Sequence, residues 1–419
     1  TDLDIAQVNA LTPPPTGTPP VYDYAKGEAV LNYLRGDATN EVTEQGEKKT
    51  GSAYGFRYRS SGIGDIIYSN PFYEGISNSG YRDALESSLY STFRRSTITR
   101  RPLLYVGSND GMLHAFDVET GKELLAYIPS VVFKKLVNLS QLSYNSSHLF
   151  YVDSSPRVDD AFVNSAWRSL LLGRLGAGGQ GVFVLDVTNP GIKGSATEFG
   201  DFAETNASNL VWWEFTDADD VDLGYTFGQS AIAKMNSNQW AVVFGNGYNS
   251  ESTLYTDGST DSRVGSGRGV LFLISADKPT AGSAPTVIKK MDTNTATNLP
   301  SPLGSFLFGG LSTPYIYDLD GDNKVDWIYA GDLQGNVWKF DVSDSSPASW
   351  TVKLLFTATD STGKRQPITS SPIVIPHPKG GVMVLFGTGK YLGPTDITST
   401  TGGVVTDPQT YYGICHQEH

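Results

Sequence analysis

One unit recurs along this 419-residue chain: an apolar strand, a Gly-rich turn, and a second apolar strand that usually ends in Asp-Val. Four copies are clear, and a fifth begins in the same way and then diverges. They are LLYVGSNDGMLHAFDV (103–118), LLLGRLGAGGQGVFVLDV (170–187), WAVVFGNGYNS with GRGVLFLIS (240–275), DWIYAGDLQGNVWKFDV (326–342) and VMVLFGTGKYL (382–392). Because one hairpin cannot bury its apolar face alone, these copies predict stacked β-sheets.

Each copy follows a short segment in which small residues lead into a strand. These segments are SNPFY (69–73), SSPRV (154–158), GQSAIA (228–233), STPYIY (312–317) and SSPIVI (370–375). Their constant order predicts an all-β fold: a β-propeller of four-stranded blades, with the first-half strand near the axis and the Gly-turn hairpin toward the outside. The 45 glycines and the aromatic content of 11% agree with this class. Unrelated β-hairpins are the alternative, since Gly-turn hairpins are common.

Two regions are expected. Residues 1–55 should contain a Pro-rich, extended connector (11–20) and a short helix (22–35), and residues 56–419 should contain the blades with long inserted loops. A second helix is predicted at 81–94. Because residues 411–419 look like the beginning of a strand, we expect the propeller to be truncated before its last blades.

Four aspartates crowd the segment DLDGDNKVD (318–326). Their spacing fits a loop that binds Ca²⁺, which takes about six to eight oxygens from alternating side chains, a backbone carbonyl and a later carboxylate. The predicted ligands are Asp318, Asp320, Asp322, the carbonyl of Lys324, and Asp326. Gly321 permits the positive φ that a wrapped loop needs. Because the carboxylates repel one another, the loop should be loose without the ion.

The flanks of this segment exclude an EF-hand. TPYIY precedes it and WIYAG follows it, and both are typical of strands, whereas an EF-hand needs two helices. Tyr329 also occupies the position where an EF-hand carries its bidentate Glu. We therefore predict a calcium loop between two strands of one blade. A solvated acidic turn is the alternative.

Two other motifs have structural interpretations. Arg35-Gly36-Asp37 matches an integrin-recognition tripeptide, but it lies where a helix should end on a C-cap glycine. A second acidic cluster lacks the calcium spacing and favours a solvated loop; its members are Asp217, Asp219, Asp220 and Asp222.

No catalytic pattern emerges from the sequence. The five histidines are scattered, and His114 alternates with apolar residues as a blade residue would. The Gly-rich run 173–181 has no Gly-Lys-Ser/Thr and is interpreted as a turn between strands. The Gly-rich run 265–269 is not a nucleophile elbow, because it has no Gly-x-Ser-x-Gly between a strand and a helix.

Charge and cysteine content narrow the possible partners. The net charge of −13 argues against nucleic acid, which needs concentrated Lys and Arg. The sequence contains no apolar run of about 18 residues, so it predicts no transmembrane segment. Cys415 is the only cysteine, so an intrachain disulfide is impossible.

Several ordered motifs resemble the C-terminal propeller domain of the PilC/PilY family of type IV pilus biogenesis factors and pilus-tip adhesins. They include YLRGDATNE (33–41), FRYRSSGIGDIIYSNPFY (56–73), LGYTFGQSAIAKM (223–235), FGNGY (244–248), the 318–326 loop and AGDLQGNVWKFD (330–341). The resemblance implies a modified propeller of about seven blades, of which four to five are recognisable here. It places the calcium loop of the family on Asp318, Asp320, Asp322, the Lys324 carbonyl and Asp326.

The resemblance also implies a function. We expect a non-enzymatic, calcium-binding domain, exported through the periplasm to the pilus tip and outer surface, that regulates pilus extension and retraction, twitching motility and attachment. Expected partners are minor pilins or other pilus-tip components, and a host-cell receptor. The 103–118 stretch also resembles a quinoprotein blade, so the alternative is a periplasmic propeller enzyme or a glycan-binding module. The single cysteine argues against the enzyme, because quinoproteins commonly use a vicinal disulfide.

Overall fold

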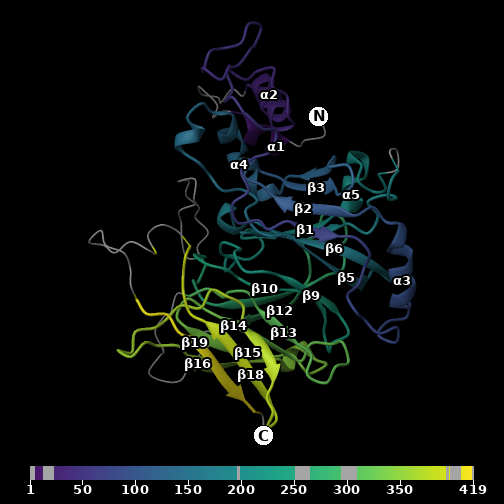
Figure 1. The fold of residues 1–419 in the computed structure, drawn as a ribbon, viewed down its shortest axis with the longest axis vertical. Helices are drawn as coiled ribbons and strands as arrows, with labels where there is room; N and C mark the ends of the chain where they lie inside the picture. The colour runs from purple at the N-terminus through teal and green to yellow at the C-terminus, as the bar shows by residue number, and fades with distance from the viewer. Residues whose placement is uncertain are drawn as a thin grey trace.

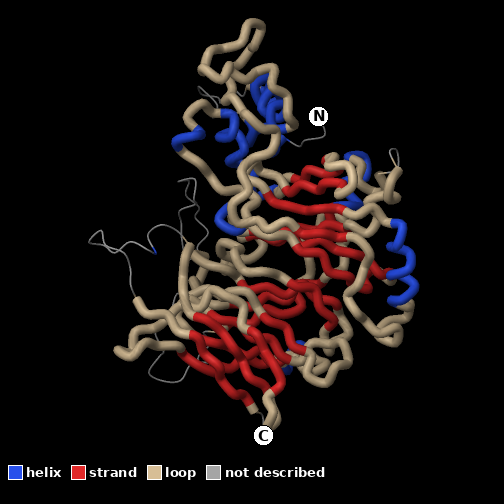
Figure 2. The backbone as a smooth tube through the Cα atoms, viewed as in Figure 1, coloured by secondary structure: helices blue, strands red, loops and turns tan. Residues whose placement is uncertain are grey.

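The computed structural model describes residues 5–12, 23–195, 199–250, 265–293, 309–392, 396 and 407–417. Within these ranges the chain is mostly β, with short helices at one end and along one side (Figure 2). The strands form five antiparallel sheets, four with four strands and one with three. In this part of the chain, no helix has the length and apolar character needed to cross a membrane.

The strands follow one another in chain order within each sheet. Sheet 1 contains β1 (Phe72–Glu74), β2 (Leu103–Gly107), β3 (Leu113–Asp117) and β4 (Glu123–Tyr127). Sheet 2 contains β5 (Arg157–Val163), β6 (Ala166–Arg174), β7 (Gly181–Asp186) and β8 (Val211–Thr216). Sheet 3 contains β9 (Ala231–Lys234), β10 (Trp240–Gly245), β11 (Val270–Ser275) and β12 (Val287–Asp292). Sheet 4 contains β13 (Tyr315–Tyr317), β14 (Trp327–Gly331), β15 (Asn336–Asp341) and β16 (Thr351–Thr357). Sheet 5 contains β17 (Ile373–Pro376), β18 (Val382–Gly387) and β19 (Tyr411–His416).

The helices are short. The α-helices are α1 (Ile5–Leu11), α2 (Tyr24–Leu34), α3 (Tyr90–Ser96), α4 (Phe133–Leu136) and α5 (Ala207–Leu210). Short 3-10 helices cover Thr97–Thr99, Ser130–Val132, Val137–Ser140, Tyr144–Ser146, Gly176–Gly178, Glu204–Asn206 and Pro347–Ser349.

Each sheet corresponds to one copy of the sequence repeat. The first-half segment forms the first strand, and the Gly-turn hairpin forms the second and third strands. In sheet 1, for example, Leu103 pairs with Asp117 and Gly107 pairs with Leu113 across the hairpin. A fourth strand then forms the other edge in sheets 1 to 4. The predicted all-β fold of repeated antiparallel blades is confirmed.

Successive sheets stack from the N-terminal helices to the end of the chain (Figure 1). First strands of neighbouring sheets contact one another, namely β1 with β5, β5 with β9, and β13 with β17. Apolar cores fill the spaces between sheets. Phe215 of sheet 2 packs against Phe244 and Phe272 of sheet 3, with ring centroids 6.1 and 5.3 Å away. Because these apolar cores lie between neighbouring sheets, each core is shared by two blades.

The N-terminal helices cover the end of sheet 1. Helix α2 forms where it was predicted, and the side chain of Asp23 caps it by accepting from the Lys26 N–H at 3.0 Å. Helix α1 was not predicted; it packs against α2 and α4. The end of α1 at Leu11 falls inside the expected connector, of which residues 13–20 lie outside the described residues.

The helix predicted at 81–94 begins later than expected. Only Tyr90–Ser96 is helical in this region. Residues 81–89 make tertiary contacts instead. The ring of Tyr81 packs against two rings that also contact each other, with its centroid 5.6 Å from that of Trp167 and 5.1 Å from that of Trp240. Glu86 pairs with Lys234. These contacts outweigh the helical propensity of the segment.

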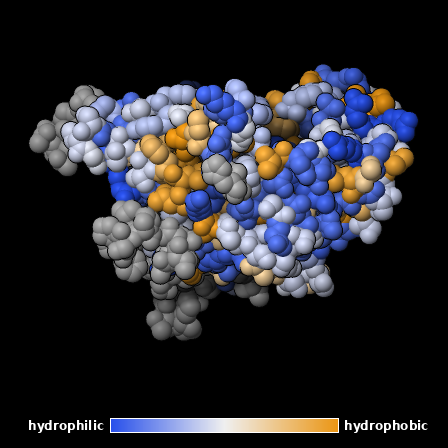
Figure 3. Space-filling view, turned by 90° about the horizontal axis from the view of Figure 1, so that it is seen from below, coloured by the Kyte–Doolittle hydropathy of each residue, from blue (hydrophilic) through white to orange (hydrophobic). Residues whose placement is uncertain are grey.

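Sheet 5 exposes one apolar face. Val374, Val384 and Phe386 lie in a core that sheet 5 shares with sheet 4. On the opposite face, Ile373 and Tyr411 are 51% and 69% exposed. Figure 3, which views the molecule from the end that carries sheet 5, shows an apolar surface area beside the undescribed residues.

Candidate metal centre

The acidic segment 318–326 connects β13 to β14 and forms the tip of a hairpin in which Tyr317 pairs with Trp327. Two residues of the loop have left-handed backbones, Gly321 at φ 75° and Asn323 at φ 72°. Glycine adopts this conformation without cost, and asparagine is among the side chains that tolerate it best. The loop therefore lies between two strands of one blade, as predicted.

Three of the predicted side chains converge. Carboxylate oxygens of Asp318, Asp320 and Asp326 all lie within 4.8 Å of one another. Among the described residues, this is the only group of three or more acidic, histidine or cysteine side chains that are close enough to hold a metal ion together.

Asp322 is not part of this group. One of its carboxylate oxygens accepts the backbone N–H of Lys324 at 2.7 Å, and the other lies 3.6 Å from Lys324 Nζ. The assignment of Asp322 and of the Lys324 carbonyl as ligands therefore stays a prediction.

Backbone N–H groups orient the converging carboxylates. Asp318 accepts from Gly321 at 2.7 Å and, through its second oxygen, from Asn323 at 2.8 Å. Asp320 accepts from Asp322 at 3.0 Å. Asp326 accepts from Leu319 at 2.8 Å, which closes the loop across its mouth. The loop folds around its own acidic side chains and holds them close together.

The electrostatics of the loop favour a cation. Burial raises the pKa of the Asp326 carboxyl group, and the charges of Asp320 and Asp318 raise it further. Two carboxylates that lie within 4.8 Å of each other repel by about 3 kcal/mol or more at an effective dielectric constant of about 20. The donor set is made of carboxylate oxygens, which Ca²⁺ and Mg²⁺ prefer over the nitrogen and sulfur ligands of transition metals. The residues present therefore fit a hard divalent cation.

Neighbouring elements hold the loop from two sides. The side-chain amide of Asn236, in the β9–β10 turn, donates to Asp326 Oδ1 and to the Val325 carbonyl, both at 3.0 Å. The backbone N–H of Arg82 donates to Asn323 Oδ1 at 3.2 Å. Sequence reasoning missed both residues, and no local pattern in the sequence points to either of them.

The second acidic cluster is a solvated loop only in part, because Asp219 is exposed, whereas Asp217 is buried and Asp220 and Asp222 are partly buried. Lys290 of β12 lies 2.8 Å from a carboxylate oxygen of Asp220 and 2.7 Å from one of Asp222. The backbone N–H of Ser266 also donates to Asp222 at 2.6 Å. A lysine from the neighbouring hairpin compensates these charges.

The 35–37 tripeptide ends helix α2 as expected. Gly36 has φ +100°, and its N–H donates to the Tyr33 carbonyl. Arg35 pairs with Glu204 at 2.6 Å, and the Asp37 carboxylate accepts the Thr39 N–H at 2.7 Å. The Asp37 side chain therefore stabilises the turn after α2, and Arg35 forms an exposed ion pair with a residue far away in the sequence.

His114 and the Gly-rich run 173–181 also have structural roles. His114 lies in β3, buried between Asp110 and Glu123, and its Nε2 is 3.1 Å from Asp110. The Gly-rich run forms a turn between β6 and β7. A side chain at Gly178 would come within 1.6 Å of the Tyr151 carbonyl oxygen, so only glycine fits there.

The comparisons with known proteins identify relatives over most of the chain. A family model described as "PilY1 beta-propeller domain" matches residues 63–419. The chain is 36% identical to the type IV pilus biogenesis factor PilY1 of Pseudomonas aeruginosa (strain UCBPP-PA14), covering 93% of this chain and 31% of that protein. It is 34% identical to a PilY1 homolog of Xylella fastidiosa (strain Temecula1 / ATCC 700964), covering 92% of this chain and 24% of that protein. The chain thus spans less than a third of the length of these relatives.

A solved structure is also similar. The crystal structure of the Pseudomonas aeruginosa PilY1 C-terminal domain matches with a TM-score of 0.62 and 33% sequence identity. The match covers 83% of this chain and 64% of that chain.

Proposed function

This chain belongs to the PilY1 β-propeller family of type IV pilus biogenesis factors, and we propose that it is a calcium-binding propeller that regulates pilus extension and retraction. In this proposal the domain is not an enzyme. It acts at the pilus tip and the outer surface, where it contacts minor pilins or other tip components. Through this role it supports twitching motility and attachment to host cells or surfaces.

The convergence of Asp318, Asp320 and Asp326 carries the proposal. The three carboxylates belong to the loop that the sequence pattern singled out, and backbone N–H groups hold them together. Ca²⁺ bound there would neutralise their mutual repulsion and supply binding energy that stabilises the folded loop. Asp322 and the Lys324 carbonyl are the further ligands that we propose.

Two measurements test the proposal. Titration calorimetry on the purified chain should detect calcium binding that Asp318→Ala and Asp326→Ala abolish or strongly weaken. In the full-length protein, expressed from its native locus, the same substitutions should reduce surface pili and twitching motility. If the domain opposes retraction, the loss of surface pili should disappear in a strain that cannot retract its pili. Calcium binding that survives both substitutions, or unchanged piliation in both variants, would refute the proposal.

A further inference from the structure

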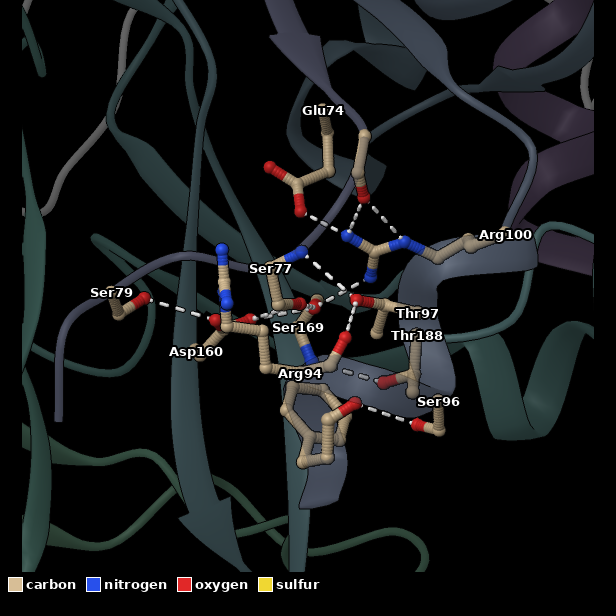
Figure 4. Close-up of polar contacts among 12 residues, drawn as sticks. Glu74, Ser77, Ser79, Arg94, Ser96, Thr97, Arg100, Asp160, Ser169 and Thr188 are labelled. Carbon is tan, nitrogen blue, oxygen red and sulfur yellow. Dashed lines mark hydrogen bonds and ion pairs between the residues drawn. The ribbon is translucent and has the colours of Figure 1, made fainter. Parts of the chain in front are cut away.

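Residues 77–90 form a closed loop whose two ends meet on one buried carboxylate. Asp160 of β5, which is 3% exposed, accepts from the hydroxyl groups of Ser77 at 3.2 Å, Ser79 at 3.0 Å and Tyr90 at 2.6 Å. Figure 4 shows Ser77 and Ser79 reaching toward Asp160 beside Ser169. We call this segment the 77–90 loop. Its base is fixed to sheet 2.

The middle of the 77–90 loop crosses to sheet 3. The Glu86 carboxylate lies 2.5 Å from Lys234 Nζ and accepts from Trp240 Nε1 at 2.8 Å. Both side chains of the Glu86–Lys234 pair are about nine-tenths buried, at 11% and 6% exposure. On sheet 2, Trp167 Nε1 donates to the Ser88 carbonyl at 2.6 Å. The loop therefore fastens sheet 2 to sheet 3.

The tip of the 77–90 loop reaches the acidic loop of sheet 4. The Arg82 N–H donates to the side-chain oxygen of Asn323, and the Asn323 N–H donates to Asp318 at 2.8 Å. One residue, Asn323, thus connects a proposed metal ligand to the tip.

A second route connects the same two loops. Asp326 accepts from Asn236, and the Val325 N–H donates to the Lys234 carbonyl at 2.9 Å. Lys234 in turn holds Glu86 of the 77–90 loop. The two routes leave the acidic loop from different residues, Asn323 and Val325, and both end on the 77–90 loop.

We propose that metal occupancy of the acidic loop controls the order of the 77–90 loop tip, residues 81–86, through Asn323. Repulsion among the carboxylates loosens the acidic loop, and a bound cation removes that repulsion. Asn323 then holds its left-handed conformation and keeps its side-chain oxygen in place for Arg82. The proposal rests on the proposed function, because it requires a cation at Asp318, Asp320 and Asp326. It adds a structural response to metal binding, which is the ordering of residues 81–86 on the surface of other blades.

Hydrogen exchange of the purified chain, measured by mass spectrometry with CaCl₂ or with EGTA, tests this inference. We expect calcium to slow exchange in a peptide covering residues 81–86 by roughly five- to tenfold, the effect of one additional hydrogen bond. A peptide from the β2–β3 hairpin (103–117) should change little.

Asn323→Gly separates the coupling from metal binding. Glycine tolerates the φ of 72° and keeps the N–H that donates to Asp318, but it removes the oxygen that receives Arg82. At saturating calcium the variant should still bind the ion by calorimetry and should lose the calcium-dependent slowing at 81–86. Asn249→Gly, at another left-handed asparagine with φ 60°, is the matched control and should behave like the wild type.

The outcomes are distinct. Calcium binding without any change of exchange at 81–86 overturns the inference and leaves the proposed function intact. Slowing that persists in Asn323→Gly, or that is equally large at 103–117, also overturns it. Absence of calcium binding to the wild-type chain overturns the inference and the proposed function together.

Discussion

Asn236 of the β9–β10 turn donates its side-chain N–H to a carboxylate oxygen of Asp326, 3.0 Å away, so the third sheet orients a proposed ligand of the fourth. Groups that orient a ligand in this way commonly change metal affinity about 10- to 100-fold when they are removed. The metal site is therefore a property of two adjacent blades.

Asn236→Ala should weaken calcium binding by about tenfold or more, because Asp326 loses the donor that fixes its orientation. Titration calorimetry measures the dissociation constant. Ser237→Ala is the matched control, since Ser237 lies in the same turn and its hydroxyl contacts Gln239 rather than the acidic loop. Equal affinities for the two variants would contradict the prediction.

Calcium should stabilise the folded chain, and Asp320→Asn should reduce that gain. At a calcium concentration a hundredfold above the dissociation constant, the free energy of unfolding should rise by about 2.7 kcal/mol. Asp320→Asn removes a charge but keeps an oxygen for the Asp322 N–H. If its affinity is tenfold weaker, the gain at the same calcium concentration falls to about 1.4 kcal/mol. Urea unfolding with calcium and with EGTA measures both values.

Asp322→Asn tests the one predicted ligand side chain that lies outside the group of three. As a ligand, Asp322 would turn toward the ion, and the substitution would lower the calcium-dependent gain about as much as Asp320→Asn does. If Asp322 is not a ligand and only accepts the Lys324 N–H, the substitution would leave the calcium-dependent gain in unfolding free energy within about 0.5 kcal/mol of the wild type.

The stability of the chain should fall above neutral pH because of His114. Burial alone would lower the pKa of His114, but hydrogen bonds and charge interactions with Asp110 and Glu123 outweigh it and raise the pKa to about 9. In the unfolded chain the pKa is near the ordinary value of about 6.5. The stabilisation of the folded chain by protonated His114 is therefore complete below about pH 6.5 and is lost as the pH rises through 9. The total loss in the free energy of unfolding is on the order of 3 kcal/mol.

His114→Gln should flatten this part of the pH profile. Urea unfolding at pH 6, 7.5 and 9.5 should show a steeper loss of stability in the wild type than in the variant. Parallel profiles for the two proteins would show that His114 does not change its protonation on unfolding.

Gly178→Ala should destabilise the chain by about 3 kcal/mol or more, because the new methyl group meets the Tyr151 carbonyl oxygen at 1.6 Å. Gly62→Ala is the control, since no atom lies within 4 Å of a methyl group placed there. Thermal unfolding of the two variants should separate them clearly, and equal midpoints would contradict the close approach.

Much of the fold could be predicted from the repeat, because short apolar runs separated by Gly-rich turns indicate which segments pair as neighbouring strands. The acidic loop could be predicted for the same reason, since its chemistry and spacing are local. The position of Asp322 could not, because the rotation of a side chain within a loop depends on its immediate partners, here the Lys324 N–H and Nζ.

Contacts between blades were beyond prediction. Lys290 compensates Asp220 and Asp222 across 70 and 68 residues of sequence. Glu86 lies outside any helix because it pairs with Lys234. This partner lies 148 residues further along the sequence. Pairings of this kind depend on how the sheets stack, and no local pattern records them.

The contact between Arg82 and Asn323 joins residues that are 241 positions apart. During synthesis the 77–90 loop emerges well before its partners on the third and fourth sheets, so its tip has nothing to dock on until those sheets exist. Closing so long a loop carries an entropic cost, and we therefore expect this contact to form late in folding. Substitutions that weaken it should accelerate unfolding and leave the folding rate nearly unchanged, because interactions absent from the transition state act on the unfolding step.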